Sequence, residues 1–296
     1  MTIKIGTGPD SWGVFTASAA DQVPWEQYLD EVAEAGFEWT ELGPYGYLPT
    51  DPSVLRSELD SRGLQVTANA IMAGHLEEPA DWPRLEKEVL RFAELGAAIG
   101  SRYFFLFDTI SFDPGSGEQV APSPLDEDGW KRLIETVHRV ADIVQGRFGL
   151  PMTFHPHADT HVQYEDQIEA LLEQTDPDRV SLLLDTGHHA YAGGDPVTFL
   201  RKHHDRISYL HLKNVERGRL ERVKAEKLTT GEATRIGVFC ELDQGVVDFG
   251  ELLGALRETG YDGWATVEQD TYRPPLGVPL AIARRTRQYL REIGMG

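Results

Sequence analysis

The chain has 296 residues, of which 41% are hydrophobic and 9% aromatic, so it is long enough to bury a sizeable core. Its formal net charge of -20 disfavours a nucleic-acid partner, because affinity for phosphates depends on Lys and Arg. The single cysteine, Cys240, excludes an intramolecular disulfide framework, and no apolar run approaches the roughly 18 residues of a membrane span, so we expect a cytoplasmic protein with no membrane partner.

Short apolar segments alternate with longer segments of helical periodicity along the chain. In chain order, the expected strands are 4–8, 37–42, 64–70, 102–107, 151–155, 180–185, 207–212 and 264–269. Between the first two, apolar residues recur with helical spacing from Trp25 to Ala33, and Gly36 ends the helix. The stretches 249–260 and 279–294 follow the seventh and eighth strands in the same way.

This alternation predicts the α/β class and a single (β/α)8 TIM barrel domain over residues 1–296, because about eight strands, each followed by a helix, close such a barrel. No Ser/Gly linker divides the chain, and the longest irregular stretch, 214–237, lies inside one strand-to-helix connection. A doubly wound open sheet is the alternative, but "GTGPDSWG" lacks the G-x-G-x-x-G spacing expected after its first strand.

Polar residues, almost all of them ionisable, gather at the carboxyl ends of these strands, where barrel active sites are built. They are Glu41, Asn69, His75, Asp108, His155, His157, Asp185, His188, His211, Lys213 and Glu268. Any one of them alone is explained as a helix cap or a satisfied polar group. Their coincidence on consecutive strands favours a shared cation, because burying so many charges around one axis is otherwise costly.

The candidate ligands also indicate the kind of metal site. Asp185, His211 and Glu268, with a histidine from "HPH" (155–157), form a mixed nitrogen and oxygen set without thiolates. We therefore expect one divalent ion, Mn or Co in the first place, with Mg, Fe or Zn as alternatives. Such an ion can chelate an α-hydroxyketone and stabilise the enediolate that forms when a base removes the α-proton.

Seven segments carry a resemblance to a known family: "PDSWGV", "TELGPYGYLP", "FHPHADTHVQ", "LLLDTGHHAYAGGD", "HLKN", "GVVDF" and "VEQD". Through them the chain resembles the xylose isomerase-like barrels, a group with sugar isomerases, keto-sugar epimerases, inosose dehydratases and endonuclease IV, and among these it is most similar to the inosose dehydratases. The resemblance implies metal ligands at Asp185, His211 and Glu268. The fourth ligand would be His155, at the position where epimerases have a glutamate.

The resemblance further implies a hydro-lyase of inositol catabolism that removes water from 2-keto-myo-inositol and yields a trihydroxycyclohexanedione. On this interpretation His157 or His188 is the acid or base, and Lys213 neutralises developing oxyanion charge beside Glu268. The candidate substrate-binding residues are Trp12, Glu41, His75 and Asp108.

Some positions depart from the dehydratase pattern, with Asp159 and His161 where glycines are expected and Asn214 where aspartate is usual. These departures concern the substrate, a cyclic polyol ketone or a keto-sugar, more than the metal. The main alternative is a keto-sugar isomerase or epimerase that uses the same ion. Metal-dependent DNA repair is disfavoured by the acidic charge, and a non-catalytic sugar-binding barrel is a further alternative. Whether copies of the chain form a homo-oligomer is left open.

Overall fold

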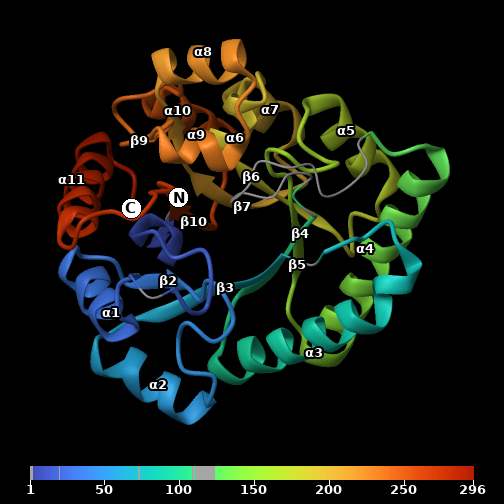
Figure 1. Cartoon of the computed structure of the whole chain (residues 1–296), viewed down its shortest axis with the longest axis horizontal. Coiled ribbons are helices and arrows are strands. Elements are labelled where there is room, and N and C mark those ends of the chain that lie inside the picture. Colours follow the sequence, from blue (N-terminus) through green and yellow to red (C-terminus); the bar gives the residue numbers. More distant parts are fainter. Residues whose placement is uncertain (1–2, 20, 73, 109, 111–123) are drawn as a thin grey trace.

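The computed structural model describes residues 3–19, 21–72, 74–108, 110 and 124–296. Eight parallel strands close into a barrel in the order β1-β10-β7-β6-β5-β4-β3-β2, which confirms the predicted fold class (Figure 1). The barrel strands are β1 (Lys4–Thr7), β2 (Trp39–Glu41), β3 (Gln65–Met72), β4 (Tyr103–Phe107), β5 (Met152–His155), β6 (Ser181–Asp185), β7 (Ile207–Leu212) and β10 (Trp264–Val267).

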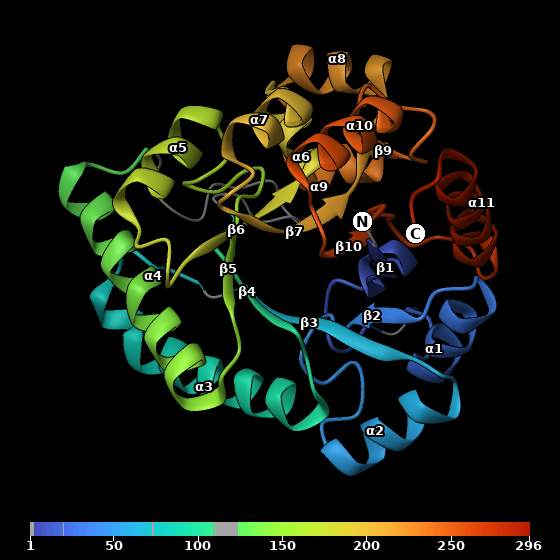
Figure 2. The ribbon, with the colours of Figure 1, turned by 180° about the vertical axis from the view of Figure 1, so that it is seen from behind.

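Helices form the outer layer of the barrel (Figure 2). They are α1 (Trp25–Glu34), α2 (Pro52–Ser61), α3 (Trp82–Ile99), α4 (Glu127–Phe148), α5 (Glu165–Gln174), α6 (Thr186–Tyr191), α7 (Pro196–His203), α8 (Arg217–Glu226), α9 (Thr230–Arg235), α10 (Phe249–Thr259) and α11 (Val278–Ile293). Two 3-10 turns, η1 (Pro9–Trp12) and η2 (Pro79–Asp81), lie in the connections. Among the described residues, no helix has both the length and the apolar character that crossing a membrane requires.

Side chains inside the barrel form a small core of their own, separate from the larger core between strands and helices. This inner core contains Ala68, Phe105, Leu183 and Tyr209, all fully buried. Successive residues of a strand point to opposite faces, so the residue two positions later also points inward. Asp185 follows Leu183 by two positions and His211 follows Tyr209 by two positions. The ionisable side chains therefore lie directly above the apolar inner core.

The stretch 214–237, which sequence analysis treats as irregular, contains the short strand β8 (Asn214–Val215) and the helices α8 and α9. β8 pairs antiparallel with β9 (Phe239–Cys240). The Glu216 side chain accepts hydrogen bonds from the amides of Gly218 and Arg219 and so caps α8. Only two residues of α8 are buried, Leu220 and Val223, so its apolar periodicity is too weak to reveal a helix.

Candidate metal centre

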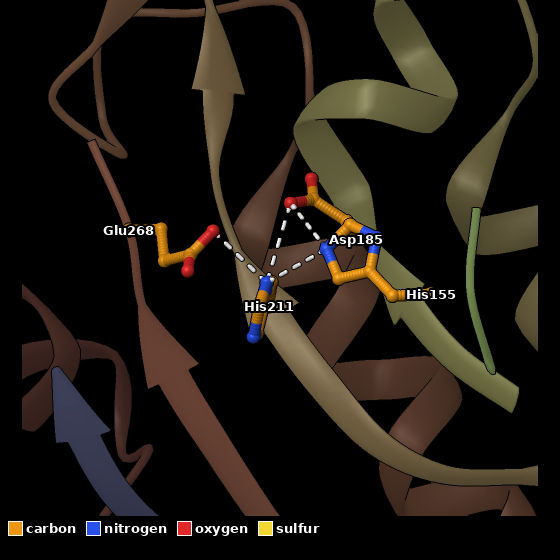
Figure 3. Close-up of side chains that lie close together, drawn as sticks. All are labelled: His155, Asp185, His211 and Glu268. Atoms are coloured by element: carbon orange, nitrogen blue, oxygen red, sulfur yellow. Dashed lines mark hydrogen bonds and ion pairs between the residues drawn. The ribbon is translucent and has the colours of Figure 1, made fainter. Parts of the chain in front are cut away.

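Four side chains at the carboxyl ends of four strands converge above the inner core (Figure 3): three belong to β5, β6 and β7, and Glu268 directly follows β10. Nδ1 of His211 lies 3.1 Å from Nε2 of His155, 3.5 Å from Oδ2 of Asp185 and 2.9 Å from Oε2 of Glu268. One donor atom from each of His155, Asp185, His211 and Glu268 lies within 4.8 Å of the other three. The structure thus brings together the four predicted metal ligands. The histidine of the "HPH" segment that lies in this group is His155, and His157 is not part of it.

The donor atoms fit a divalent ion. Oδ1 of Asp185 accepts the His188 amide at the start of α6, whereas its buried Oδ2 accepts no hydrogen bond within the described chain. The Lys213 ammonium, 3.3 Å from this oxygen, compensates part of its charge, and a divalent ion would compensate the rest. Burial lowers the pKa of His155, which favours the neutral imidazole that a metal needs. Two imidazoles and two carboxylates are a set that binds first-row divalent ions.

The remaining nitrogen of His211 is held by a carboxylate. Nε2 of His211 lies 3.1 Å from Oε1 of Glu41, and the Tyr209 hydroxyl donates to the same oxygen over 3.1 Å. A carboxylate behind a ligating histidine fixes its tautomer and ring orientation. This contact keeps Nδ1 of His211 directed at the other ligands. Glu41, expected from the sequence to bind substrate, lines the cavity and also supports His211.

A buried lysine lies beside the four donors. Nζ of Lys213 is 2.8 Å from Oε2 of Glu268, 3.3 Å from Oδ2 of Asp185 and 3.1 Å from Oδ2 of Asp270. Burial opposes its charge, but Asp185 and then Asp270 raise the pKa of Lys213 well above its usual value. The ammonium is therefore charged and partly balances the carboxylates. Nζ also lies 3.1 Å from Nε2 of His188.

The two candidate acid–base histidines lie against each other, with ring centroids 3.7 Å apart. Nδ1 of His157 is 2.7 Å from the carbonyl oxygen of Ala158. Burial, and then the neighbouring His155, lowers the pKa of His157 to about 4, so its ring is neutral near pH 7. Burial and the neighbouring His157 also lower the pKa of His188 well below its usual range. His157 lines the cavity, whereas His188 does not.

A cavity of about 360 Å³ opens above these residues. Its lining includes His155, His157, Lys213 and Glu268, and also Tyr45, Phe92 and Arg91. The Arg91 guanidinium stacks on the Tyr45 ring at 4.1 Å from the ring centroid. The cavity is of a size that holds a single small ring with its hydroxyl groups, and two of the candidate ligands, His155 and Glu268, line it.

The structure does not bring three of the predicted substrate-binding residues to this cavity. Trp12 is 2% exposed, donates from Nε1 to Oε2 of Glu31 over 2.7 Å, and lines a separate cavity of about 230 Å³. The His75 side chain is 41% exposed and pairs with Glu77. Asp108 is buried and accepts the backbone amide of His161. The sequence suggested these three residues from their positions near strand ends, and position alone does not determine the direction of a side chain.

Two residues that line the cavity were missed, Asp10 in η1 and Asp270 just after β10. Both belong to segments quoted for the resemblance, "PDSWGV" and "VEQD". Burial, and then Glu268 and Asp270, raises the pKa of Asp10 well above its usual value. Applying the strand-end rule to β1, which ends three residues before Asp10, would have added Asp10 to the candidates without giving the direction of its side chain.

The unusual residues of the sequence have structural roles. Asp159 has a positive φ of 63°, the conformation that favours glycine, and its carboxylate accepts hydrogen bonds from the amide and hydroxyl of Thr230 at the start of α9. The amide group of Asn214, fully buried, donates to the carbonyls of Leu242 and Val247. An aspartate at position 214 could not donate both bonds.

Comparison with known proteins agrees with these features. A family model described as "Xylose isomerase-like TIM barrel" matches residues 29–293. The chain is 34% identical to an inosose dehydratase of Geobacillus kaustophilus, over 98% of this chain and 94% of that protein, and 31% identical to one of Geobacillus thermodenitrificans, over 98% and 97%. A crystal structure of the IolI protein "with a binding zinc atom" has a similar fold, with a TM-score of 0.72 at 15% identity, over 98% of this chain and 96% of that one. With a match over most of its length, the chain belongs to the xylose isomerase-like TIM barrel family.

Proposed function

We propose that this protein is an inosose dehydratase, a hydro-lyase that removes water from 2-keto-myo-inositol in inositol catabolism. Full-length relatives that are 34% and 31% identical carry that name. The observation in the structure that carries the proposal is the buried group of two histidines and two carboxylates at the end of a cavity sized for one small ring. The substrate is a small polyhydroxylated ketone.

The proposed metal ligands are His155, Asp185, His211 and Glu268. Their donor set suits Mn or Co, and Mg, Fe or Zn are alternatives. A divalent ion held there supplies Lewis-acid polarisation of the ketone oxygen. Glu41 orients His211 for this purpose through its contact with Nε2.

His157 is the proposed base that removes the proton from the carbon next to the ketone. It lines the cavity, and its low pKa of about 4 leaves an imidazole nitrogen free of a proton near pH 7. The electrons of the broken C–H bond form the new C=C bond, and the hydroxyl of the next carbon leaves with a proton as water. The resulting enol then tautomerises to the dione.

Lys213 is proposed to stabilise negative charge that develops on a substrate oxygen, because its ammonium lines the cavity. His188 lies outside the cavity lining, and its Nε2 is close to Nζ of Lys213. We therefore assign His188 to the support of Lys213 and the proton transfer to His157. The sequence alone left these two histidines interchangeable.

The decisive experiment is incubation of the metal-loaded protein with 2-keto-myo-inositol, with detection of the trihydroxycyclohexanedione by its mass, 18 Da below that of the ketone, the mass of one water. Chelator-treated protein is the control and should form no dione. A product of unchanged mass with inverted stereochemistry would instead identify an epimerase. Binding of the ketone without any product would identify a sugar-binding barrel.

A further inference from the structure

The Asp10 carboxylate occupies the wall of the active-site cavity, apart from the four proposed metal ligands. It lies in η1, immediately after β1, and comes close to two carboxylates from the opposite end of the chain. Oxygens of Asp10, Glu268 and Asp270 lie within 4.8 Å of one another. Three acidic groups thus meet at one side of the cavity.

Asp10 differs from the other two in its polar contacts. Glu268 and Asp270 both pair with the Lys213 ammonium. No hydrogen bond or ion pair among the described residues engages the Asp10 side chain, although it is surrounded by protein on most sides. The Asp10 oxygens are therefore available for hydrogen bonds with a molecule bound in the cavity.

The backbone around Asp10 is held in place by close contacts to glycines. A Cβ atom on Gly8 would lie 2.4 Å from Oδ1 of Asp10, so any other residue at position 8 would displace the carboxylate from its present position. A Cβ on Gly43 would lie 2.6 Å from Pro9, and the amide of Gly13 donates to the carbonyl of Asp10 over 2.9 Å. The Asp10 side chain therefore projects from a tightly packed turn. Such a turn fixes the direction of the side chain, which a residue that binds a ligand in one geometry requires.

We propose that Asp10 hydrogen-bonds a hydroxyl group of the ring substrate and so selects a ketone that carries a hydroxyl at that position. This inference rests on the proposed function and adds a specificity-determining residue to it. A hydroxyl can donate to the carboxylate or accept from its acid form, so the contact survives either state.

The test compares Asp10→Ala, Asp10→Asn and the control Asp21→Asn. Asp21 lies in the same β1–α1 connection, lines the separate cavity and pairs with Arg273 at the surface. For 2-keto-myo-inositol we expect Asp10→Ala to lower kcat/KM by about tenfold or more, the usual effect of losing a hydrogen bond to a charged group. Asp10→Asn should keep part of the activity, because an amide can still bind a hydroxyl. Asp21→Asn should match the parent, and metal content should be unchanged in all three variants.

A set of ketones that each lack one hydroxyl separates contact with substrate from a structural role. The parent should have a lower kcat/KM for the ketone without the contacted hydroxyl than for the complete ketone. For Asp10→Ala, kcat/KM should be the same for these two compounds. Equal losses for parent and Asp10→Ala on every ketone of the set would overturn the inference, as would loss of metal from Asp10→Ala.

Calorimetric titration of the same ketones distinguishes failure of this inference from failure of the proposed function. If the parent binds 2-keto-myo-inositol but forms no dione, the dehydratase assignment is wrong. In that case weaker binding of the ketone by Asp10→Ala than by the parent and Asp21→Asn still supports the contact. If parent and Asp10→Ala bind with equal affinity, Asp10 does not contact the ligand. If the parent binds no polyhydroxylated ketone, both proposals fall.

Discussion

Replacing Glu41 with glutamine should weaken metal binding although Glu41 is not one of the proposed ligands. Its Oε1 lies 3.1 Å from Nε2 of His211, and both side chains are buried. A ligating His211 is a neutral imidazole whose Nε2 donates to Glu41, so the carboxylate acts by orienting the ring and by making Nδ1 more basic. Glutamine keeps an oxygen acceptor and loses the charge, so we expect only part of this effect to be lost. A tenfold to hundredfold loss of metal affinity, about 1.4 to 2.7 kcal/mol, is the usual effect of changing such a carboxylate.

The same variant should shift the pH dependence of metal binding. Although burial opposes a charge on His211, Glu268 and Glu41 raise the pKa of His211 above its usual value, so protons compete with metal at this nitrogen up to a higher pH than at an ordinary histidine. Without the Glu41 charge the pKa of His211 should fall. Competition by protons should therefore end at a lower pH in Glu41→Gln than in the parent, while the affinity at high pH stays below that of the parent.

The assay is a competition between protein and a chromophoric chelator for Co or Mn, repeated from pH 5.5 to pH 9. The control is Glu38→Gln, which makes the same chemical change at an exposed position three residues earlier. An affinity and a pH profile for Glu41→Gln that coincide with those of Glu38→Gln would refute the reasoning, because the carboxylate would then have no influence on the ligand it contacts.

Three further predictions concern the ligand group, the base and the fold. Asp185→Ala should abolish stoichiometric metal binding, because it removes the donor whose Oδ2 accepts no hydrogen bond, and elemental analysis would detect retained metal. His157→Asn should keep the metal and lower kcat by about a hundredfold or more, the usual range for a lost general base, as measured in the dione assay. Asn214→Asp should lower the free energy of unfolding by about 2 to 4 kcal/mol, because the carbonyls of Leu242 and Val247 lose buried donors, and a denaturation midpoint equal to that of the parent would contradict this.

The barrel could be predicted because its strands are short, apolar and regularly separated. The eight expected strands correspond to the eight that close the barrel. Helix α8 could not be predicted, since Leu220 and Val223 alone give it an apolar side. Its capping residue Glu216 is visible in the sequence only once a helix is already suspected.

The site was predictable where the strand dictates the direction of the side chain. His211 and Asp185 follow inner-core residues by two positions, so their inward direction follows from strand geometry. Trp12 and Asp10 lie in a 3-10 turn, where no such periodicity applies. The sequence could not tell that Trp12 turns away to Glu31 while Asp10 faces the cavity.

The unusual backbone at Asp159 links two connections of the barrel that are far apart in the sequence. A non-glycine residue with φ of 63° costs on the order of 1 kcal/mol because of its Cβ, whereas the Asp159 carboxylate holds the first residue of α9. A glycine at position 159 would relieve the strain and release the helix in one step. Natural variation at positions 159 and 230 should therefore be correlated, with glycine at position 159 accompanied by loss of the hydroxyl at position 230. In relatives with that glycine, the connection between β7 and α10 should open more readily.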